Sequence, residues 1–354
     1  MKNKGFLFRL LPLFAACLIL LCTCNGNGGG KTVRIISWNL QTFFDAQTAG
    51  TEYADFKGAK SPWNREKYEA RLDKLAAFIK ENPADIYVFQ ETENEAVLQD
   101  IANRCAGTAF LPQKPLYVCF AGETGSALGI GVLSRLPMEN VKIHRTDIRA
   151  VRGNGIKNGS DILPVLQPPL RPLLELGLQS GKKTFTLFAC HWKSKSGGEQ
   201  ASDMWRSVQE KVLAERIDFL NRETEKMPVI ACGDFNRALE EFNRRTEGQS
   251  LCFSAGEKAV ELFSAWIEFS DTREPDSRLQ KKVHTDLSRG SYYFKGKWEK
   301  IDHFFYNGFV NAVRFYAMST GAYTDDKGIP KRYNPHTGSG YSDHLPLLFE
   351  FSIQ

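Results

Sequence analysis

Short continuous apolar runs alternate along this chain with longer segments in which apolar residues recur every three or four positions. Continuous runs are typical of buried strands, and the longer spacing is typical of amphipathic helices. The runs predict buried strands at 33–40, 85–90, 116–120, 128–134, 184–190, 227–236, 300–306 and 347–351. The periodic segments predict helices that begin at Ser61-Pro62, near residue 94 and at residue 203.

The order strand, helix, strand occurs twice, over 33–90 and over 184–236. This is the pattern of a βαβ unit, in which a helix covers a sheet and connects two parallel strands. Residues 240–300 carry little pattern until a hairpin at 291–298, and residues 145–175 are predicted to form a long basic loop. No linker or change in composition follows the first 30 residues, so we expect a single domain over 31–354.

The N-terminal segment has the pattern of a secretory signal. Lys2, Lys4 and Arg9 accompany an apolar stretch, 10–21, that is too short to span a membrane comfortably. We expect a signal peptide over 1–23. Cys24 and the Gly/Asn-rich residues that follow resemble a bacterial lipoprotein signal, with Cys24 lipidated and 24–30 as a flexible tether. The expected location is therefore extracytoplasmic, either anchored to the cell envelope through Cys24 or, without lipidation, secreted.

Composition and charge narrow the class of protein only slightly. The content of 42% hydrophobic and 25% charged residues is that of an ordinary globular protein. Without Lys2, Lys4 and Arg9 the chain has 43 basic against 41 acidic residues, a net charge of +2, so its bulk charge does not indicate nucleic acid binding.

The cysteines give no sign of a zinc site. Beyond Cys24 there are five, an odd number, so at least one thiol is free, and none has the spacing of a zinc ligand. Cys190 and Cys232 lie inside apolar runs and are expected to be buried. The sequence selects no disulfide among the five.

Five polar residues come at or just after the carboxyl ends of predicted strands: Asn39, Glu91, His191, Asp234 and Asn236. Asp302 and the pair Asp343-His344 add two carboxylates and a histidine. In open α/β sheets, chemistry is located outside the carboxyl ends of the strands. Carboxylate and carboxamide oxygens suit Mg²⁺, which keeps positions for water and substrate phosphate, and Mn²⁺ or Ca²⁺ would accept similar donors. A histidine beside a carboxylate suits proton transfer or charge stabilisation. The pattern indicates metal-assisted hydrolysis of a phosphoester.

Five ordered motifs give the chain a family resemblance: Ser37-Trp38-Asn39, Gln90-Glu91, Gly233-Asp234-Phe235-Asn236, Ile301-Asp302-His303 and Ser342-Asp343-His344. Together they resemble the endonuclease/exonuclease/phosphatase superfamily, the pancreatic-deoxyribonuclease-like group, and most of all its secreted bacterial nucleases. The resemblance implies a four-layer α/β sandwich, two packed mixed β-sheets flanked by helices, with the active site at one edge.

The resemblance also implies a metal site. Glu91 would be the principal metal ligand with Asn39 beside it, and Asp343 would complete the network of metal and water. The number of metal ions stays open.

Five further residues receive catalytic roles from the same resemblance. Asp234 and Asn236 would orient the attacking water. His344, paired with Asp302, would contact the phosphate as a base or electrostatic stabiliser, and His191 would be the general acid for the leaving oxygen.

His191 lacks an evident partner in the sequence, and His303 is expected to lie outside the site. The deoxyribonuclease type supplies a carboxylate for its first histidine, and no matching Asp or Glu stands out between residues 121 and 147. His303 follows Asp302 directly and points to the other face of its strand, so it is expected to be structural.

The expected substrate is a polyanion. Four basic residues are predicted to bind it: Arg171, Lys193, Lys195 and Arg206. The aromatic residues of the 291–298 hairpin would either stack on unpaired bases or pack within the hairpin. We predict a magnesium-dependent nuclease that degrades DNA with little sequence specificity and needs no obligate protein partner. The alternatives are a sphingomyelin or phospholipid phosphodiesterase, another phosphoesterase, and an inactive surface-binding lipoprotein. Three points stay open: whether the substrate is DNA or RNA, whether cutting is endo- or exonucleolytic, and the oligomeric state.

Overall fold

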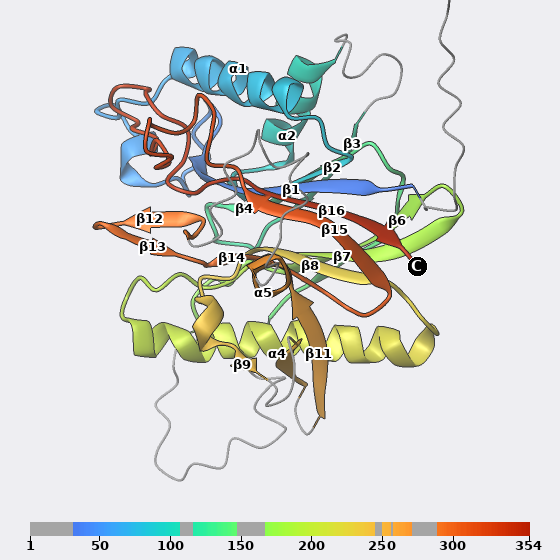
Figure 1. Cartoon of the computed structure of the whole chain (residues 1–354). Coiled ribbons are helices and arrows are strands. Elements are labelled where there is room, and N and C mark those ends of the chain that lie inside the picture. The colour runs from blue at the N-terminus through green and yellow to red at the C-terminus, as the bar shows by residue number, and fades with distance from the viewer. Residues whose placement is uncertain (1–30, 107–115, 147–166, 245–249, 256–257, 271–288) are drawn as a thin grey trace, which may run out of the picture.

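The computed structural model of the chain describes residues 31–106, 116–146, 167–244, 250–255, 258–270 and 289–354 (Figure 1). The predicted signal peptide, the tether and Cys24 lie outside the described residues, as does most of the predicted loop 145–175. Within the described ranges, no helix has both the length and the apolar character that a membrane crossing requires.

One sheet has six strands, in the order β15-β16-β1-β2-β4-β3. Its strands are β1 (Val33–Phe43), β2 (Ile86–Thr92), β3 (Tyr117–Ala121), β4 (Gly129–Ser134), β15 (Val310–Ala317) and β16 (Leu347–Ile353). Only β1 and β2 pair in parallel, and their neighbours β16 and β4 are antiparallel to them. The sheet is therefore mixed.

The second sheet has eight strands, in the order β5-β6-β7-β8-β14-β11-β10-β9. They are β5 (Met138–His144), β6 (Leu173–Ser180), β7 (Lys183–His191), β8 (Val229–Asp234), β9 (Asn243–Arg244), β10 (Ser250–Ala255), β11 (Lys258–Ser264) and β14 (Asp302–Tyr306). Here β7 and β8 form the parallel pair, between antiparallel β6 and β14. A separate hairpin joins β12 (Tyr292–Phe294) to β13 (Lys297–Glu299) and projects at one end of the sandwich (Figure 1).

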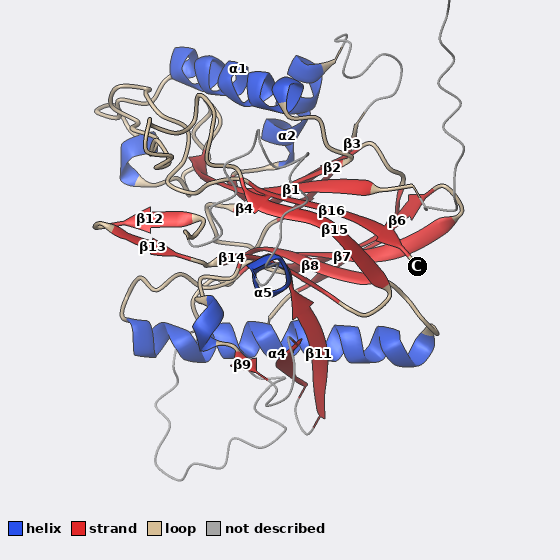
Figure 2. Cartoon of the chain, viewed as in Figure 1, coloured by secondary structure: helices blue, strands red, loops and turns tan. Residues whose placement is uncertain are grey.

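The two sheets lie face to face between layers of helix (Figure 2). Helices α1 (Arg65–Glu81) and α2 (Glu95–Cys105) cover the outer face of the six-stranded sheet, and α4 (Glu199–Glu223) covers the other sheet. The short elements are α5 (Ala265–Ser270) and the 3₁₀ turns η1 (Ala54–Phe56) and η2 (Leu239–Glu241). This is the four-layer sandwich that the sequence predicts.

Strand alternation divides the buried residues between two principal cores. In β1, Val33 and Ile35 belong to the cluster between the sheets, whereas Ile36 and Trp38 belong to the cluster beneath α1 and α2. Side chains two positions apart share a face, so a strand buried on both sides needs an unbroken apolar run. That requirement is why the central strands stand out in the sequence.

Helix starts follow their capping residues. The Asn64 side chain accepts a hydrogen bond from the Lys67 amide, so α1 begins at Arg65 and not at Ser61-Pro62. Asn94 caps α2 in the same way, where the sequence places it. Helix α4 begins at Glu199, four residues before its predicted start, after a glycine with a positive φ of 108° at position 198.

Several strands escape the sequence pattern. β5 has only exposed and half-buried positions, and β15 is mostly open, so neither forms a continuous apolar run. β6 begins at Leu173, inside the predicted loop 145–175. No disulfide joins the five cysteines of the described part of the chain, and Cys190 and Cys232 are buried as predicted.

Candidate active site

Three neighbouring strands bring a row of polar side chains to the end of the eight-stranded sheet. His191 of β7 is the register partner of Asp234 in β8, and Asp234 is the register partner of Asp302 in β14. Register partners share a face, so the three side chains lie side by side on one face. All three are buried. A histidine and two carboxylates that are far apart in sequence are thus adjacent in space.

Gly233 makes this row possible through a close approach of β7 and β8. Its φ is 137°, and a Cβ atom at this position would lie 2.0 Å from the Cys190 carbonyl oxygen. Only glycine tolerates both the conformation and the contact. Gly233 lies inside β8, directly before Asp234.

In the six-stranded sheet, the backbone redirects Glu91 toward the site. Alternation from Ile86 and Val88 would place Gln90, and not Glu91, on the inner face of β2. The pairing register shifts after Gln90, and Glu91 has a φ of 63°. Bulges of this kind re-aim side chains beside active sites. The Glu91 carboxylate accepts hydrogen bonds from Asn39 Nδ2 at 3.3 Å and from the Thr42 amide at 2.7 Å.

A buried arginine supports this strained segment from behind. Gln41 and Thr42 both have positive φ, at 51° and 57°. Arg71 of α1 donates hydrogen bonds to the carbonyl oxygens of residues 40–42, and its guanidinium lies 3.7 Å from the ring centroid of Tyr333. Non-glycine residues in this conformation cost about 1–3 kcal/mol each and persist only where neighbouring groups hold them. Arg71 therefore fixes the amide that binds Glu91.

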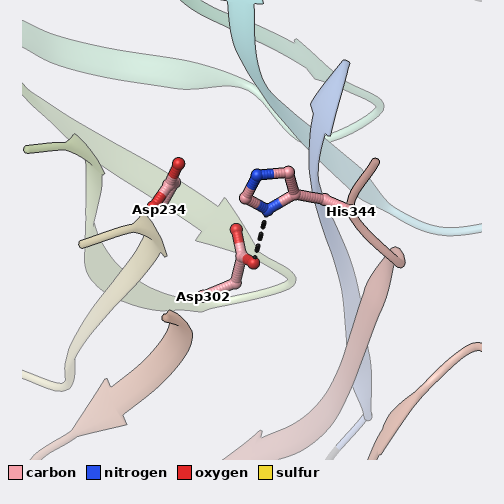
Figure 3. Close-up of side chains that lie close together, drawn as sticks. All are labelled: Asp234, Asp302 and His344. Atoms are coloured by element: carbon pink, nitrogen blue, oxygen red, sulfur yellow. Dashed lines mark hydrogen bonds and ion pairs between the residues drawn. The ribbon is translucent and has the colours of Figure 1, made fainter. Parts of the chain in front are cut away.

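His344 and Asp302 form a buried hydrogen-bonded pair (Figure 3). His344 Nδ1 lies 2.8 Å from Asp302 Oδ2, which also accepts a hydrogen bond from Ser291 Oγ at 2.6 Å. The backbone of His344 is fixed by Ser342 Oγ, which accepts from its amide, and by Trp38 Nε1, which donates to its carbonyl oxygen. Two residues of the recognised motifs therefore hold the histidine in place.

The charges around His344 keep it protonated. Burial by itself lowers the pKa of His344, but the carboxylates of Asp302, Asp234 and Asp343 outweigh that effect and raise the pKa to about 10. Burial, and then the neighbouring Asp302 carboxylate, raise the pKa of Asp234. With Nδ1 bonded to Asp302, the other nitrogen of an imidazolium remains as a donor in the cavity that His344 lines.

Asp234 is the centre of the hydrogen-bond network between the two sheets. Its Oδ2 accepts from Asn39 Nδ2 at 2.9 Å, and its Oδ1 accepts from the Asn236 amide at 2.8 Å. Asn236 has a φ of 48° and donates through Nδ2 to the Trp192 carbonyl oxygen. Asn39 bonds to Glu91 as well, so it connects carboxylates from the two sheets.

His191 lies beneath the carboxylates. Its Nε2 is 3.7 Å from Asp234 Oδ2 and 4.0 Å from Glu91 Oε1. Burial and then the nearby cations Arg171, His344 and Lys193 lower its pKa well below the usual value. Among the described groups, Nδ1 has no hydrogen-bond partner. His191 thus contacts the carboxylates of both sheets, and its role as the general acid for the leaving oxygen stays a prediction.

An open cavity of about 1050 Å³ lies above this network. Glu91, Asp234, Asn236, Asp343 and His344 line its floor, and they come from both sheets. The walls carry basic and aromatic side chains, namely Tyr53, Phe56, Arg171, Lys195, Tyr292, Phe294, Arg332, Tyr333 and His336. The cavity has room for a nucleotide-sized anion, and its chemistry suits one.

The four predicted substrate-binding residues separate into two groups. Arg171 and Lys195 line the cavity, although Lys195 also forms ion pairs with Glu199, Glu241 and Glu299. Lys193 and Arg206 do not line it. The Lys193 ammonium group folds back onto Ser194 and Ser196.

Arg206 is fully buried and holds the loop after β7. It donates to the Lys193 and Glu199 carbonyl oxygens and to Ser202 Oγ. The structure therefore places Arg206 as a support for this loop and not as a direct substrate contact.

Two groups of donors could hold a divalent cation. Asp234, Asp302 and His344 offer ligand atoms within 4.8 Å of one another. In that group, however, His344 Nδ1 and Asp302 Oδ2 are already bonded to each other, and Asp302 Oδ2 also accepts a hydrogen bond from Ser291 Oγ. Glu91 and Asp234 offer carboxylate oxygen atoms at the cavity floor, the chemistry that Mg²⁺ prefers, and Asn39 Nδ2 bonds to both carboxylates. The donor set therefore fits a hard cation at Glu91.

Asp343 lines the same cavity, beside His344. Its Oδ1 is 4.0 Å from His344 Nε2, and its Oδ2 is 3.5 Å from Arg332 Nη1. Of the three predicted metal ligands, Asn39 and Glu91 are therefore in contact with each other. Asp343 lines the same cavity as Glu91, but its own contacts are with His344 and Arg332.

Sequence reasoning missed Arg71, Ser291 and Arg332. Arg71 carried a signal, because Tyr68, Leu72, Leu75 and Ile79 put it on the apolar face of its helix. Ser291 and Arg332 carried none, since they reach the site only through the packing of loops. The expectation for His303 is confirmed: it is buried on the other face of β14, where its Nε2 bonds to the Arg237 carbonyl oxygen.

Carboxylates, an imidazolium and a place for a hard cation around one open cavity define a metal-dependent phosphoesterase site. The chain matches the model of the Endonuclease/Exonuclease/phosphatase family over residues 36–344, and it belongs to that family. Members of this family are metal-dependent phosphodiesterases and nucleases, so the protein is a hydrolase of this class. The predicted family, fold and enzyme class are confirmed.

Solved structures support the fold. Truncated TDP2 of Caenorhabditis elegans superposes with a TM-score of 0.55 at 14% identity, covering 91% of this chain and 97% of that chain. TDP2 of D. rerio with a single strand DNA product gives 0.51 at 15% identity, with coverage of 91% and 99%. An endonuclease/exonuclease/phosphatase family protein from Bacteroides thetaiotaomicron gives 0.50 at 14% identity, with coverage of 92% and 99%. No curated protein matches the chain by sequence.

Proposed function

We propose that this protein is a magnesium-dependent nuclease that degrades DNA with little sequence specificity. One observation carries the proposal: the cavity above Glu91, Asp234 and His344 is open, about 1050 Å³ in volume, and its walls include basic and aromatic side chains beside the acidic Asp55 and Glu299. An open cavity of this kind admits a chain that continues on both sides of the scissile phosphate. The described residues contain no recognisable base-reading module, which is why we expect little specificity.

The residues on the cavity floor suit hydrolysis of a phosphodiester. The His344 imidazolium, oriented by Asp302, contacts the phosphate and stabilises the negative charge that develops there. Asp234 and Asn236 orient the attacking water. The water oxygen bonds to phosphorus as the bond to the leaving oxygen breaks. The proton lost by water passes to Asp234, and the leaving oxygen takes a proton from solvent in the open cavity.

We further propose Mg²⁺ as the metal, held by Glu91 with Asn39 beside it and with Asp343 completing the network of metal and water. When bound, it supplies positive charge to the phosphate oxygens. The donors are oxygen atoms, which favours Mg²⁺ or Mn²⁺ over the softer metals.

The proposed location is extracytoplasmic, with a lipid anchor at Cys24. It rests on the N-terminal pattern alone: a basic segment, an apolar stretch, Cys24 and a Gly/Asn-rich tether. Mass spectrometry of the mature N-terminus from cells, with Cys24→Ser as the comparison, tests it. A mature chain that begins at an acylated Cys24 supports anchoring, and an unmodified later start supports secretion.

The nuclease proposal is tested by incubating the purified protein with DNA, RNA and sphingomyelin vesicles, each with Mg²⁺ and with a chelator. We expect DNA cleavage that the chelator abolishes. His344→Gln should lose this cleavage, whereas His336→Gln, at an exposed histidine on the cavity wall, should keep most of it. DNA left intact under conditions where vesicles are hydrolysed would overturn the proposal.

A phospholipid or sphingomyelin phosphodiesterase is the second candidate, and Phe294 is the observation that favours it. This side chain is 42% exposed on the hairpin at the cavity wall, where an apolar ring could enter a lipid surface. The adjacent Lys295 and the polar cavity floor are equally compatible with nucleic acid. The vesicle arm of the same experiment decides between the two.

A further inference from the structure

We propose that Tyr292 and Phe294 form a binding subsite for one unpaired base beside the scissile phosphate. The inference rests on the proposed nuclease function and narrows its substrate to strands with unstacked bases. The two rings are called the aromatic strip below. It belongs to the β12–β13 hairpin, which projects beside the cavity (Figure 1).

The hairpin presents different residues on its two faces. Tyr292 and Phe294 are two positions apart in β12, so they share a face, and both line the cavity. Their rings are nearly parallel, with an interplanar angle of 15° and centroids 6.0 Å apart. Tyr293 points to the opposite face, where it pairs with Trp298 of β13.

The two faces of the hairpin therefore have different roles: one packs against the protein, and the other is free to stack on a base. Trp298 packs against the hydrophobic core between the sheets, and Tyr293 packs on Trp298 with centroids 5.0 Å apart. These two residues therefore anchor the hairpin. The aromatic strip is left open toward the cavity, with Phe294 42% exposed.

The aromatic strip begins at the phosphate-binding histidine. Tyr292 forms an isolated antiparallel bridge with His344, and their ring centroids are 4.6 Å apart. Phe294 is the next ring beyond Tyr292. A phosphate in contact with His344 therefore has its attached nucleoside within reach of the aromatic strip, because a nucleotide places its base one sugar away from its phosphate.

A tight turn holds Phe294 in position. Phe294 and Lys297 are register partners, and the two residues between them, Lys295 and Gly296, have φ values of 47° and 83°. Two consecutive positive φ values define the two-residue turn that matches strand twist. Such a turn leaves Phe294 little freedom, so stacking on it costs little conformational entropy.

The charge at the end of the aromatic strip favours a nucleic acid strand. Lys295 Nζ lies 5.2 Å from the Phe294 ring centroid, where it can meet the next phosphate along the strand. Every base has a π-face, so an aromatic platform binds bases without reading their sequence. In a duplex those faces are covered by neighbouring base pairs. The geometry thus selects single strands and frayed ends.

The test compares two substrates that differ only in their bases. One is a single-stranded DNA oligonucleotide, and the other is a strand of equal length in which every residue is abasic. The full-length protein with Mg²⁺ should have the higher kcat/KM on the strand with bases. Phe294→Ala should reduce the ratio of the two kcat/KM values about tenfold, within the range measured for one base on one ring. Phe294→Trp should restore it.

Phe263→Ala is the matched control. Phe263 is similarly exposed, at 38%, but it lies in β11 and does not line the cavity. Its substitution should leave the ratio unchanged.

Four results would overturn the inference. If Phe294→Ala lowers kcat/KM equally on both strands, Phe294 supports the site in general and does not bind a base. If neither kcat/KM value changes, Phe294 makes no contact with the substrate. Loss of vesicle hydrolysis with the oligonucleotide ratio intact would assign Phe294 to a lipid surface. If the wild-type protein cleaves neither strand, the nuclease function itself fails. The first two results leave that function standing.

Discussion

The two βαβ units, β1–α1–β2 and β7–α4–β8, build the two sides of one active site by different means. Each joins two parallel strands through a helix on the outer face of its sheet. The second unit delivers His191 and Asp234 as register partners in an unbroken parallel ladder. The first unit delivers Asn39 as the last residue of its regular register and Glu91 only where the register shifts.

The difference has a physical reason. Regular alternation already places Asp234 on the inner face, and Gly233 supplies the one contact that a side chain would block. Glu91 begins on the wrong face, so a positive φ must turn it toward the site. Within the strands of the two units, the non-glycine residues with positive φ are Gln41, Thr42 and Glu91 of the first unit, whereas in the second unit the positive φ falls on Gly233.

Each helix contributes a buried arginine that binds backbone at or just beyond the end of the first strand of its unit. Arg71 of α1 binds the carbonyl oxygens of 40–42, and Arg206 of α4 binds those of Lys193 and Glu199. The same device therefore serves two purposes. Arg71 holds a strained backbone against Glu91, and Arg206 shapes the loop at the cavity edge.

The largest expected effect comes from replacing the carboxylate that each unit contributes, Glu91 or Asp234, by an amide. Both Glu91→Gln and Asp234→Asn should lower kcat by on the order of 10²–10⁴-fold, because each removes a charge from the floor of the site. Raising the Mg²⁺ concentration should restore part of the activity of Glu91→Gln but not that of Asp234→Asn. The measurement is kcat as a function of Mg²⁺ concentration.

Glu225→Gln, at a surface glutamate, is the control for this pair. If both active-site variants respond equally to Mg²⁺, the two units share the metal, and the proposed division of roles is wrong.

Gly233→Ala tests the tight ladder of the second unit. The added Cβ would meet the Cys190 carbonyl oxygen at 2.0 Å, and φ would remain strained at 137°. We expect a loss of about 4 kcal/mol in the free energy of unfolding, measured by urea denaturation. Gly308→Ala, where the nearest atom is 3.9 Å away and φ is not positive, should change it by less than about 1 kcal/mol. Similar losses in both variants would exclude close packing as the cause.

The buried arginines should differ in function more than in stability. Arg71→Met and Arg206→Met should each lower the free energy of unfolding by about 3 kcal/mol, because several buried carbonyl groups lose their donor. Arg71→Met should raise the Mg²⁺ concentration needed for half-maximal activity. Arg206→Met should instead raise KM with little change in that concentration. A shift in metal requirement from Arg206→Met would show that the two loops are coupled.

The smallest predicted effect concerns a buried carboxylate outside the site. Glu175 of β6 bonds to Arg216 of α4 and to His144 of β5. Burial opposes ionisation, but these partners outweigh it and lower the pKa of Glu175 from 4.5 to about 2. A lowered folded-state pKa gives stability that is complete above about pH 4.5 and disappears as the pH falls toward 2.

Glu175→Gln should therefore cost about 2 kcal/mol at pH 7, with the difference from wild type shrinking as the pH falls below 4.5. Glu350 of the other sheet pairs with Arg34 and Arg314 nearer the surface, so Glu350→Gln should cost less than about 1 kcal/mol. Urea denaturation at several pH values measures both. If the difference in the free energy of unfolding between wild type and Glu175→Gln does not change with pH, the ion pairs of Glu175 are not its cause.

The sequence by itself determined the central strands, the two βαβ units, the family and the motif residues that the structure brings together. It could do so because strands buried on both faces must be continuously apolar, and because Asn39, Glu91, Asp234 and His344 stand in motifs of fixed order. The edge strands β5 and β15 could not be seen, because exposed strands need no apolar run.

Only the tertiary structure decided where the side chains of the site point and what they touch. The turn of Glu91 toward Asn39 depends on a backbone conformation that no residue type encodes, and the burial of Arg206 depends on the path of the loop it holds. The roles of Tyr292 and Tyr293 likewise follow from which face of their hairpin meets the core. Spacing along the chain limits these contacts, but packing between distant segments selects them.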